Sequence, residues 1–139
     1  MSLQTHNVKF TYEDYLIFPE DGRRHELIDG ERFMTPAPST RHQRIVGKLV
    51  RFLGDYVART KAGEVFDAPT DVIFSEFDVV QPDLLFISAA RASIITEKNI
   101  QGPPDFVIEI ISQTSRKTDE TIKRKLYERY GVREYWIVD

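Results

Sequence analysis

Two acidic residues lie in stretches whose other members are apolar. Glu109 lies within Phe106-Val107-Ile108-Glu109-Ile110-Ile111, and alternation along a strand puts it on the same face as Val107 and Ile111. Asp83 lies between Val79-Val80 and Leu84-Leu85. A buried ionised carboxylate costs several kcal/mol unless it is compensated. Each residue therefore needs a metal ion, a basic partner, hydrogen bonds, or a raised pKa that leaves it neutral.

One divalent cation between neighbouring strands would compensate both carboxylates at once. Oxygen ligands favour magnesium or manganese over zinc. We therefore expect Asp83 and Glu109 to be metal ligands, with Mg²⁺ as the cofactor and Mn²⁺ as the alternative. Pro82 precedes Asp83 and indicates an edge or bulged position in its strand.

A lysine follows on the next predicted helix, over residues 118–130. At roughly 100° per residue, Asp119 and Lys123 fall within the arc of the apolar side chains, whereas Arg124 and Lys125 fall outside it. An inward Lys123 could reach the same pocket, where it would stabilise a phosphate or position the attacking water. The alternative is a plain ion pair between Asp119 and Lys123, which are four residues apart.

The elements that must position these residues alternate between helix and strand. Asp29-Gly30 is the signal for a tight type I′ hairpin. Thr40 with Gln43 matches a capping box and opens a long core helix that ends near Gly63. The other predicted elements are a short helix over residues 12–18, extended segments over 64–66, 70–74 and 79–87, and strands over 106–111 and 134–138. This order predicts an α/β (α+β) fold, a mixed β-sheet flanked by helices.

Composition limits the possible classes of protein. A chain of 139 residues with 41% hydrophobic residues suits one domain, which we expect to span residues 1–139. The chain has no cysteine, which excludes disulfides, thiolate zinc sites and cysteine nucleophiles and is compatible with the cytoplasm. Neither a targeting signal at the N-terminus nor an apolar run of about 18 residues is present, so we expect no membrane partner.

The net charge is -3, so any contact with nucleic acid must be local. Positive charge is clustered in two stretches, although solvated helix faces look the same. One comprises Arg41, Arg44, Lys48 and Arg51, and the other comprises Arg116, Lys117, Lys123, Arg124, Lys125, Arg129 and Arg133.

Several motifs together resemble the Uma family of restriction endonucleases, within the PD-(D/E)XK nuclease superfamily. They are Glu26-Leu27-Ile28-Asp29-Gly30-Glu31, His42 at a helix start, Gln81-Pro82-Asp83-Leu84-Leu85, Val107-Ile108-Glu109-Ile110-Ile111-Ser112, the Asp119, Lys123, Tyr127 spacing, and Glu134-Tyr135-Trp136-Ile137-Val138-Asp139. The order and spacing of these motifs are more specific than any one of them, and they cover nearly the whole chain.

The resemblance implies a restriction-endonuclease-like fold, a magnesium-type cation and endonucleolytic hydrolysis of DNA phosphodiesters. It carries over Asp83 and Glu109 as metal ligands and adds Glu26 as a further acidic member. Position 111, which is lysine in the wider superfamily, is Ile here, and the family's lysine corresponds to Lys123. The resemblance also implies that the chain lacks a C-terminal extension, and many such nucleases act as homodimers.

For each of the remaining candidate residues, a role in the site and a purely structural role are both open. His42 lies on the core-facing stripe of the long helix, either as a member of the site or as a buried, hydrogen-bonded histidine. Ser112, Thr114, Ser115 and Arg116 follow the Glu109 strand and could contact phosphate, or the hydroxyls could cap the next helix.

Three functions remain open on the sequence. The first, which we favour, is a metal-dependent endonuclease. The second is a non-catalytic module that binds nucleic acid through the basic residues of 116–133. The third is a structural or partner-binding domain in which Lys123 forms a buried ion pair with one carboxylate.

Overall fold

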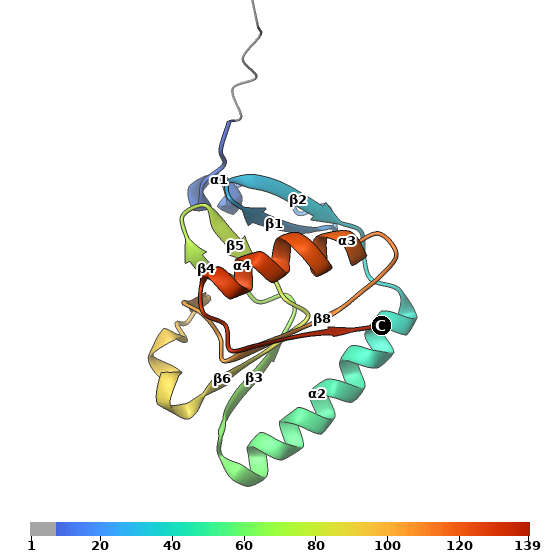
Figure 1. Cartoon of the computed structure of the whole chain (residues 1–139), viewed down its shortest axis with the longest axis vertical. Helices are drawn as coiled ribbons and strands as arrows, with labels where there is room; N and C mark the ends of the chain where they lie inside the picture. Colours follow the sequence, from blue (N-terminus) through green and yellow to red (C-terminus); the bar gives the residue numbers. More distant parts are fainter. Residues whose placement is uncertain (1–7) are drawn as a thin grey trace, which may run out of the picture.

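The computed structural model describes residues 8–139, which form two mixed β-sheets and their flanking helices (Figure 1). Residues 1–6, for which the sequence predicted no targeting signal, lie outside the described residues. The fold class predicted from the sequence is confirmed, and the strands are divided between the two sheets. Among the helices of residues 8–139, none combines the length and the apolar character that crossing a membrane requires.

The N-terminal part supplies the first sheet. After α1 (Tyr12–Leu16) come β1 (Arg24–Ile28) and β2 (Glu31–Thr35), an antiparallel hairpin. Asp29 and Gly30 have φ values of 52° and 73°, the positive pair that a type I′ turn requires, so the predicted hairpin is confirmed. The sheet has the order β2-β1-β5-β4-β7, with β4 (Val72–Ser75), β5 (Asp78–Val80) and β7 (Ile100–Gln101).

The second sheet carries the rest of the core. Its order is β3-β6-β8-β9, built from β3 (Gly63–Asp67), β6 (Leu84–Ser88), β8 (Phe106–Ile110) and β9 (Glu134–Val138). Its one parallel pair is β8 with β9, and a short 3₁₀ helix, η1 (Ala89–Ile94), follows β6. The predicted extended segment over 79–87 is two strands in different sheets, because the chain leaves β5 and enters β6 across Gln81-Pro82-Asp83.

Helix α2 (Thr40–Thr60) covers one face of the four-stranded sheet. Its N-cap is Ser39, whose hydroxyl accepts from the His42 backbone N–H, so the capping box predicted from Thr40 is wrong by one residue. Apolar side chains of α2 pack against Leu84, Ile108 and Ile110. The helix therefore covers the face of β8 opposite to the face that carries Glu109.

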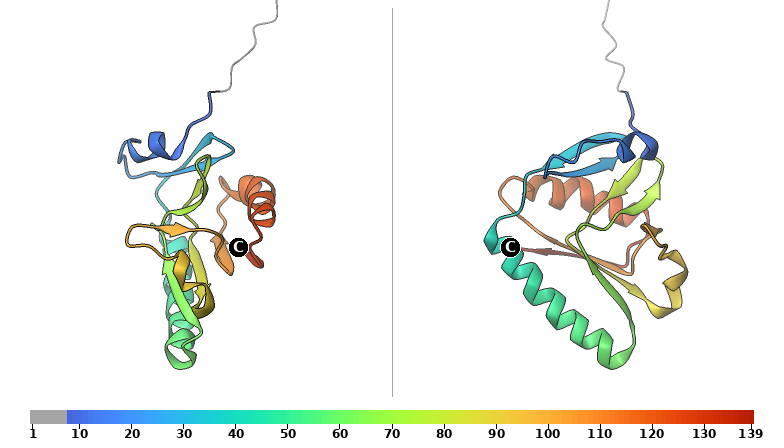
Figure 2. Two further views of the ribbon diagram at one scale, coloured as in Figure 1. Left: turned by 90° about the vertical axis from the view of Figure 1, so that its left-hand side faces the viewer. Right: turned by 180° about the vertical axis from the view of Figure 1, so that it is seen from behind.

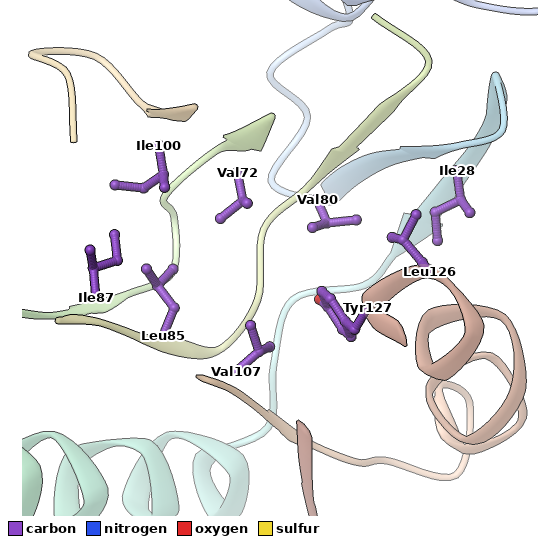
Figure 3. Close-up of a cluster of buried hydrophobic side chains, with 9 residues drawn as sticks. All are labelled: Ile28, Val72, Val80, Leu85, Ile87, Ile100, Val107, Leu126 and Tyr127. Carbon is purple, nitrogen blue, oxygen red and sulfur yellow. The ribbon is translucent and has the colours of Figure 1, made fainter. Parts of the chain in front are cut away.

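A second helical run covers the opposite face of the sheet, as the two views of Figure 2 show. It comprises α3 (Arg116–Thr118), the π-helical η2 (Asp119–Lys123) and α4 (Arg124–Arg129). Leu126 and Tyr127 of α4 pack with Val107 of β8 and with apolar residues of the first sheet, such as Val80 (Figure 3). This cluster joins the two sheets, and the helical run brings its inward side chains to their junction.

Candidate active site

Asp83 and Glu109 lie side by side at the junction of the two sheets. The Asp83 backbone N–H donates to Glu109 Oε1 at 3.2 Å, and the Ile110 backbone N–H donates to Asp83 Oδ2 at 2.8 Å. Each carboxylate is thus held by a backbone amide of the segment that carries the other. Asp83 is 3% exposed and Glu109 is 2% exposed, so both are buried as the sequence pattern predicted.

Lys123 reaches the same point from the helical run. Its Nζ lies 2.6 Å from Glu109 Oε2 and 2.9 Å from Glu26 Oε1, and the side chain is buried. Asp119, the alternative partner predicted four residues away, is at 3.9 Å from Nζ. The ammonium group therefore bridges β1 and β8 in addition to facing its own helix.

Three further side chains complete the cluster, and the sequence reasoning had not assigned the first two to it. Arg24 Nη1 donates to Asp83 Oδ1 at 2.8 Å, and the Tyr127 hydroxyl donates to Glu109 Oε2 at 3.0 Å. His42, a predicted candidate, places Nε2 at 3.2 Å from Asp83 Oδ1. The sequence does contain signals for Arg24 and Tyr127. Arg24 is two residues before Glu26 on the same strand face, and Tyr127 lies in the apolar arc with Lys123.

The π-helical turn is a feature that sequence reasoning missed. Asp119 and Lys123 are the first and last residues of η2, and both are buried. The Tyr135 hydroxyl of β9 donates to the Asp119 backbone carbonyl at 2.9 Å, inside the helical run. The Asp119 carbonyl thus has a donor from outside the helix, and π-helical turns are frequent at functional sites.

Negative charge exceeds positive charge in the cluster. Four buried carboxylates, Glu26, Asp83, Glu109 and Asp119, face two permanent cations, Lys123 and the partly buried Arg24. Burial raises the pKa of Glu109 to about 8, against the opposing effect of Lys123 and with reinforcement from Asp83 and Glu26. Burial alone would lower the pKa of Lys123, but the surrounding carboxylates, Glu109 foremost, raise it. The lysine therefore stays charged while Glu109 binds a proton readily.

A cavity of about 550 Å³ opens beside these groups. Its lining includes His42 and the hydroxyl residues Ser112, Thr114 and Ser115. The backbone amides of Ser112 and Ser115 donate to each other's hydroxyls, so these side chains also order the turn before α3. Arg116 does not line the cavity, because its guanidinium group pairs with Glu120 at 3.1 Å and with Asp139 at 2.6 Å.

The chain matches the model of one protein family over nearly its whole length. The model of the Uma2 family, described as "Putative restriction endonuclease", matches residues 12–139. The chain belongs to the Uma2 family. The resemblance inferred from the sequence motifs is thereby confirmed, and membership in this family supports a nuclease.

The fold has a relative of known structure. It is similar to the crystal structure of "a putative nuclease belonging to DUF820" from Anabaena variabilis ATCC 29413, with a TM-score of 0.78 and 22% sequence identity. The match covers 94% of this chain and 74% of that chain. No curated protein matches the chain significantly in sequence. At this identity, the structural likeness bears on the fold.

The donor set of the cluster fits a hard divalent cation such as magnesium. Within residues 8–139, His, Asp and Glu side chains form no ready-made group of three metal ligands. Magnesium does not require one, because it keeps several waters and binds through one or two carboxylates. Asp83 and Glu109 offer an adjacent pair of carboxylates. With all four carboxylates ionised, the cluster would carry two more negative than positive charges, which one such ion would balance.

Proposed function

We propose that this chain is a magnesium-dependent endonuclease that hydrolyses DNA phosphodiester bonds. The observation that carries the proposal is the convergence of more buried carboxylates than cations at one end of a cavity. An arrangement of this kind is unfavourable on its own, because each unpaired charge loses its hydration. It becomes favourable when a cation binds.

The metal would be held by Asp83 and Glu109, with Glu26 as a further acidic member of the site. A bound divalent cation would lower the pKa of a coordinated water and polarise the phosphate. Glu26 is held in place by the Gln81 backbone N–H, which donates to its Oε2 at 2.8 Å. Glu26 and Glu109 in turn fix the lysine ammonium at a defined position.

Lys123 and the cavity lining would bind the phosphate. The Lys123 ammonium is strongly held in its charged form, so it supplies positive charge where the phosphate becomes more negative. Arg24 and His42 approach Asp83 from the other side and keep its carboxylate oriented. Ser112, Thr114 and Ser115 offer hydroxyl groups to phosphate oxygens, whereas the ion pairs of Arg116 direct that side chain elsewhere.

The structural alternative explains less of the cluster. A buried ion pair of Lys123 with Glu109 is present, as that alternative requires. The folded state would be at least as stable with one carboxylate for each cation, or with apolar residues of similar volume in place of the charged ones. The excess of carboxylates has no structural benefit and favours the metal site.

The test combines cleavage with metal binding. Wild-type protein, Asp83→Ala and the exposed control Glu120→Gln are incubated with single-stranded and plasmid DNA in magnesium or manganese, and manganese binding is measured by calorimetry. We expect Asp83→Ala to lose both cleavage and binding heat, and Glu120→Gln to keep both. Cleavage that persists in Asp83→Ala would come from a contaminant, and the absence of binding heat in the wild type would refute the proposal.

A further inference from the structure

The buried carboxylates of the acidic cluster line a cavity that is also lined by apolar side chains. We propose that the cavity accepts a single unpaired DNA strand, so that the substrate is single-stranded DNA, a frayed end or a bubble in a duplex. This inference rests on the proposed function and specifies its substrate. Three observations support it: the depth of the acidic cluster, the charge around the cavity, and the apolar part of its lining.

The carboxylates of the cluster line the cavity. Asp83 and Glu109 are almost fully buried, so the scissile phosphate must enter the space of about 550 Å³ to approach them. That volume is typical of a site for a small organic ligand, on the order of one or two nucleotides. The bases of a duplex are paired between its two backbones, so a duplex can bring a phosphate but not a base into this space, whereas an unpaired nucleotide can bring both.

The charge around the cavity does not suit a duplex either. Five carboxylates and three Lys or Arg side chains line it. A duplex has one negative charge for every ~1.7 Å of its axis, and non-specific binding depends on many contacts with basic residues. The cavity lining offers few such contacts, and its excess negative charge matches the need for one divalent ion instead.

Of the side chains in the two basic clusters of the sequence, only Lys123 lines the cavity. On a helix with roughly 100° per residue, Arg44 and Lys48 of α2 lie about 160° from Val46, which lines the cavity. In the second cluster, Arg116 pairs with Glu120 and Asp139, and Arg129 pairs with Asp78. The basic side chains therefore provide no continuous track for a double helix into the site.

Apolar side chains give the cavity a surface for unpaired bases. Phe33 and Met34 of β2 line it, together with Pro36 and Pro38 of the connection to α2 and Pro69 of the β3–β4 connection. Bases of any sequence stack on aromatic side chains, which is how many proteins bind single strands. A base that is stacked and paired inside a duplex cannot use this surface.

The first experiment compares one labelled oligonucleotide in different pairing states: as a single strand, as a perfect duplex, and as a duplex with a central unpaired bubble. Wild-type cleavage gives kcat/KM with magnesium or manganese. Fluorescence anisotropy with Glu109→Gln, which the proposed function makes inactive, gives Kd for the same DNAs. We expect the single strand and the bubble to be preferred over the duplex by on the order of tenfold in both measurements, as the gain from stacking unpaired bases implies.

The second experiment removes the aromatic face from the cavity. Phe33→Leu keeps an apolar side chain where Phe33 packs against the core, and we expect it to raise Kd for the single strand by on the order of tenfold while leaving the duplex unchanged. The matched control is Phe52→Leu, at a side chain that is 74% exposed on α2 and absent from the cavity lining. Thermal unfolding checks that both variants remain folded.

The outcomes separate this inference from the proposed function. Duplex DNA that binds and is cleaved as well as the single strand overturns the inference and leaves the nuclease intact. If no DNA is cleaved with either metal, the proposed function fails, while a preference of the protein for unpaired DNA in the binding assay still supports the inference. An equal effect of Phe33→Leu and Phe52→Leu contradicts the role of the apolar lining.

Discussion

Replacement of Lys123 by methionine tests the charge balance of the site most directly. Lys123→Met keeps much of the side-chain volume and removes the positive charge that lies 2.6 Å from Glu109 and 2.9 Å from Glu26. Removing one partner of a buried ion pair costs about 3–5 kcal/mol, because the other partner is left charged and unhydrated. In this site two carboxylates lose their closest cation at once, so we expect the upper part of that range when both are ionised.

The cost should depend on pH, because a carboxylate can bind a proton in place of the lysine. The pKa of Glu109 is already raised to about 8 in the wild type, and loss of Lys123 removes the main effect that lowers it. A carboxylate whose pKa is raised by folding stabilises the folded state at low pH and loses this contribution as the pH rises through the folded-state pKa. Lys123→Met should therefore be mildly destabilised near about pH 5 and strongly destabilised near about pH 9.

Urea unfolding across this pH range, with and without manganese, measures the effect. Lys125→Met is the matched control, since it makes the same substitution at an exposed position of α4. If a divalent cation binds the site, manganese should stabilise Lys123→Met more than the wild type at high pH. Equal stability of Lys123→Met and Lys125→Met near about pH 9 would refute the account of the buried charges.

Further predictions concern single side chains. The metal-free wild type should lose stability between about pH 5 and 9 as Glu109 gives up its proton. Glu109→Gln should lose much less stability over that range, because it has no such proton to give up, and thermal unfolding at each pH measures the difference. Tyr127→Phe leaves Glu109 Oε2 with one donor fewer and should cost about 1–3 kcal/mol in urea unfolding, and no loss would mean that water replaces the hydroxyl. Gly30→Ala should destabilise by more than ~1 kcal/mol in the same assay, because φ is 73° and the added Cβ would lie 2.6 Å from the Lys9 Cβ; a neutral result would require the turn to rearrange.

Local pattern was sufficient to predict that Asp83 and Glu109 are buried and that Lys123 faces inward, whereas Glu26 came from the family resemblance. An acidic residue inside an apolar strand and a lysine inside the apolar arc of a helix are both visible within about ten residues of sequence. The hairpin at Asp29 and Gly30 was predictable for the same reason, since the turn chemistry is carried by two adjacent residues.

Non-local pairing accounts for what the sequence could not predict. Arg24 and Asp83 are 59 residues apart, and their contact depends on how the two sheets meet. The division of the strands between two sheets is likewise decided by pairings between distant segments, for example β1 with β5. The π-helical turn accepts a hydrogen bond from the Tyr135 hydroxyl of β9, a contact that no periodicity within residues 116–129 could reveal.

The break between the sheets and the acidic cluster have a common cause. Where the chain passes from β5 to β6, Pro82 has no backbone N–H and the amides around it leave the sheet ladders. Those amides donate to carboxylates: Gln81 to Glu26, and Asp83 to Glu109. The single oxygen of a glutamine could accept either of these backbone bonds, so the two bonds explain why an acceptor is needed and leave the negative charge unexplained. We therefore expect Glu26→Gln, in which Lys123 keeps Glu109 as its partner, to fold with equal or greater stability than the wild type in urea while losing manganese binding. This is the pattern of a site in which function is retained at the expense of stability. A variant that unfolds more easily and still binds the metal would show that the charge serves the fold instead.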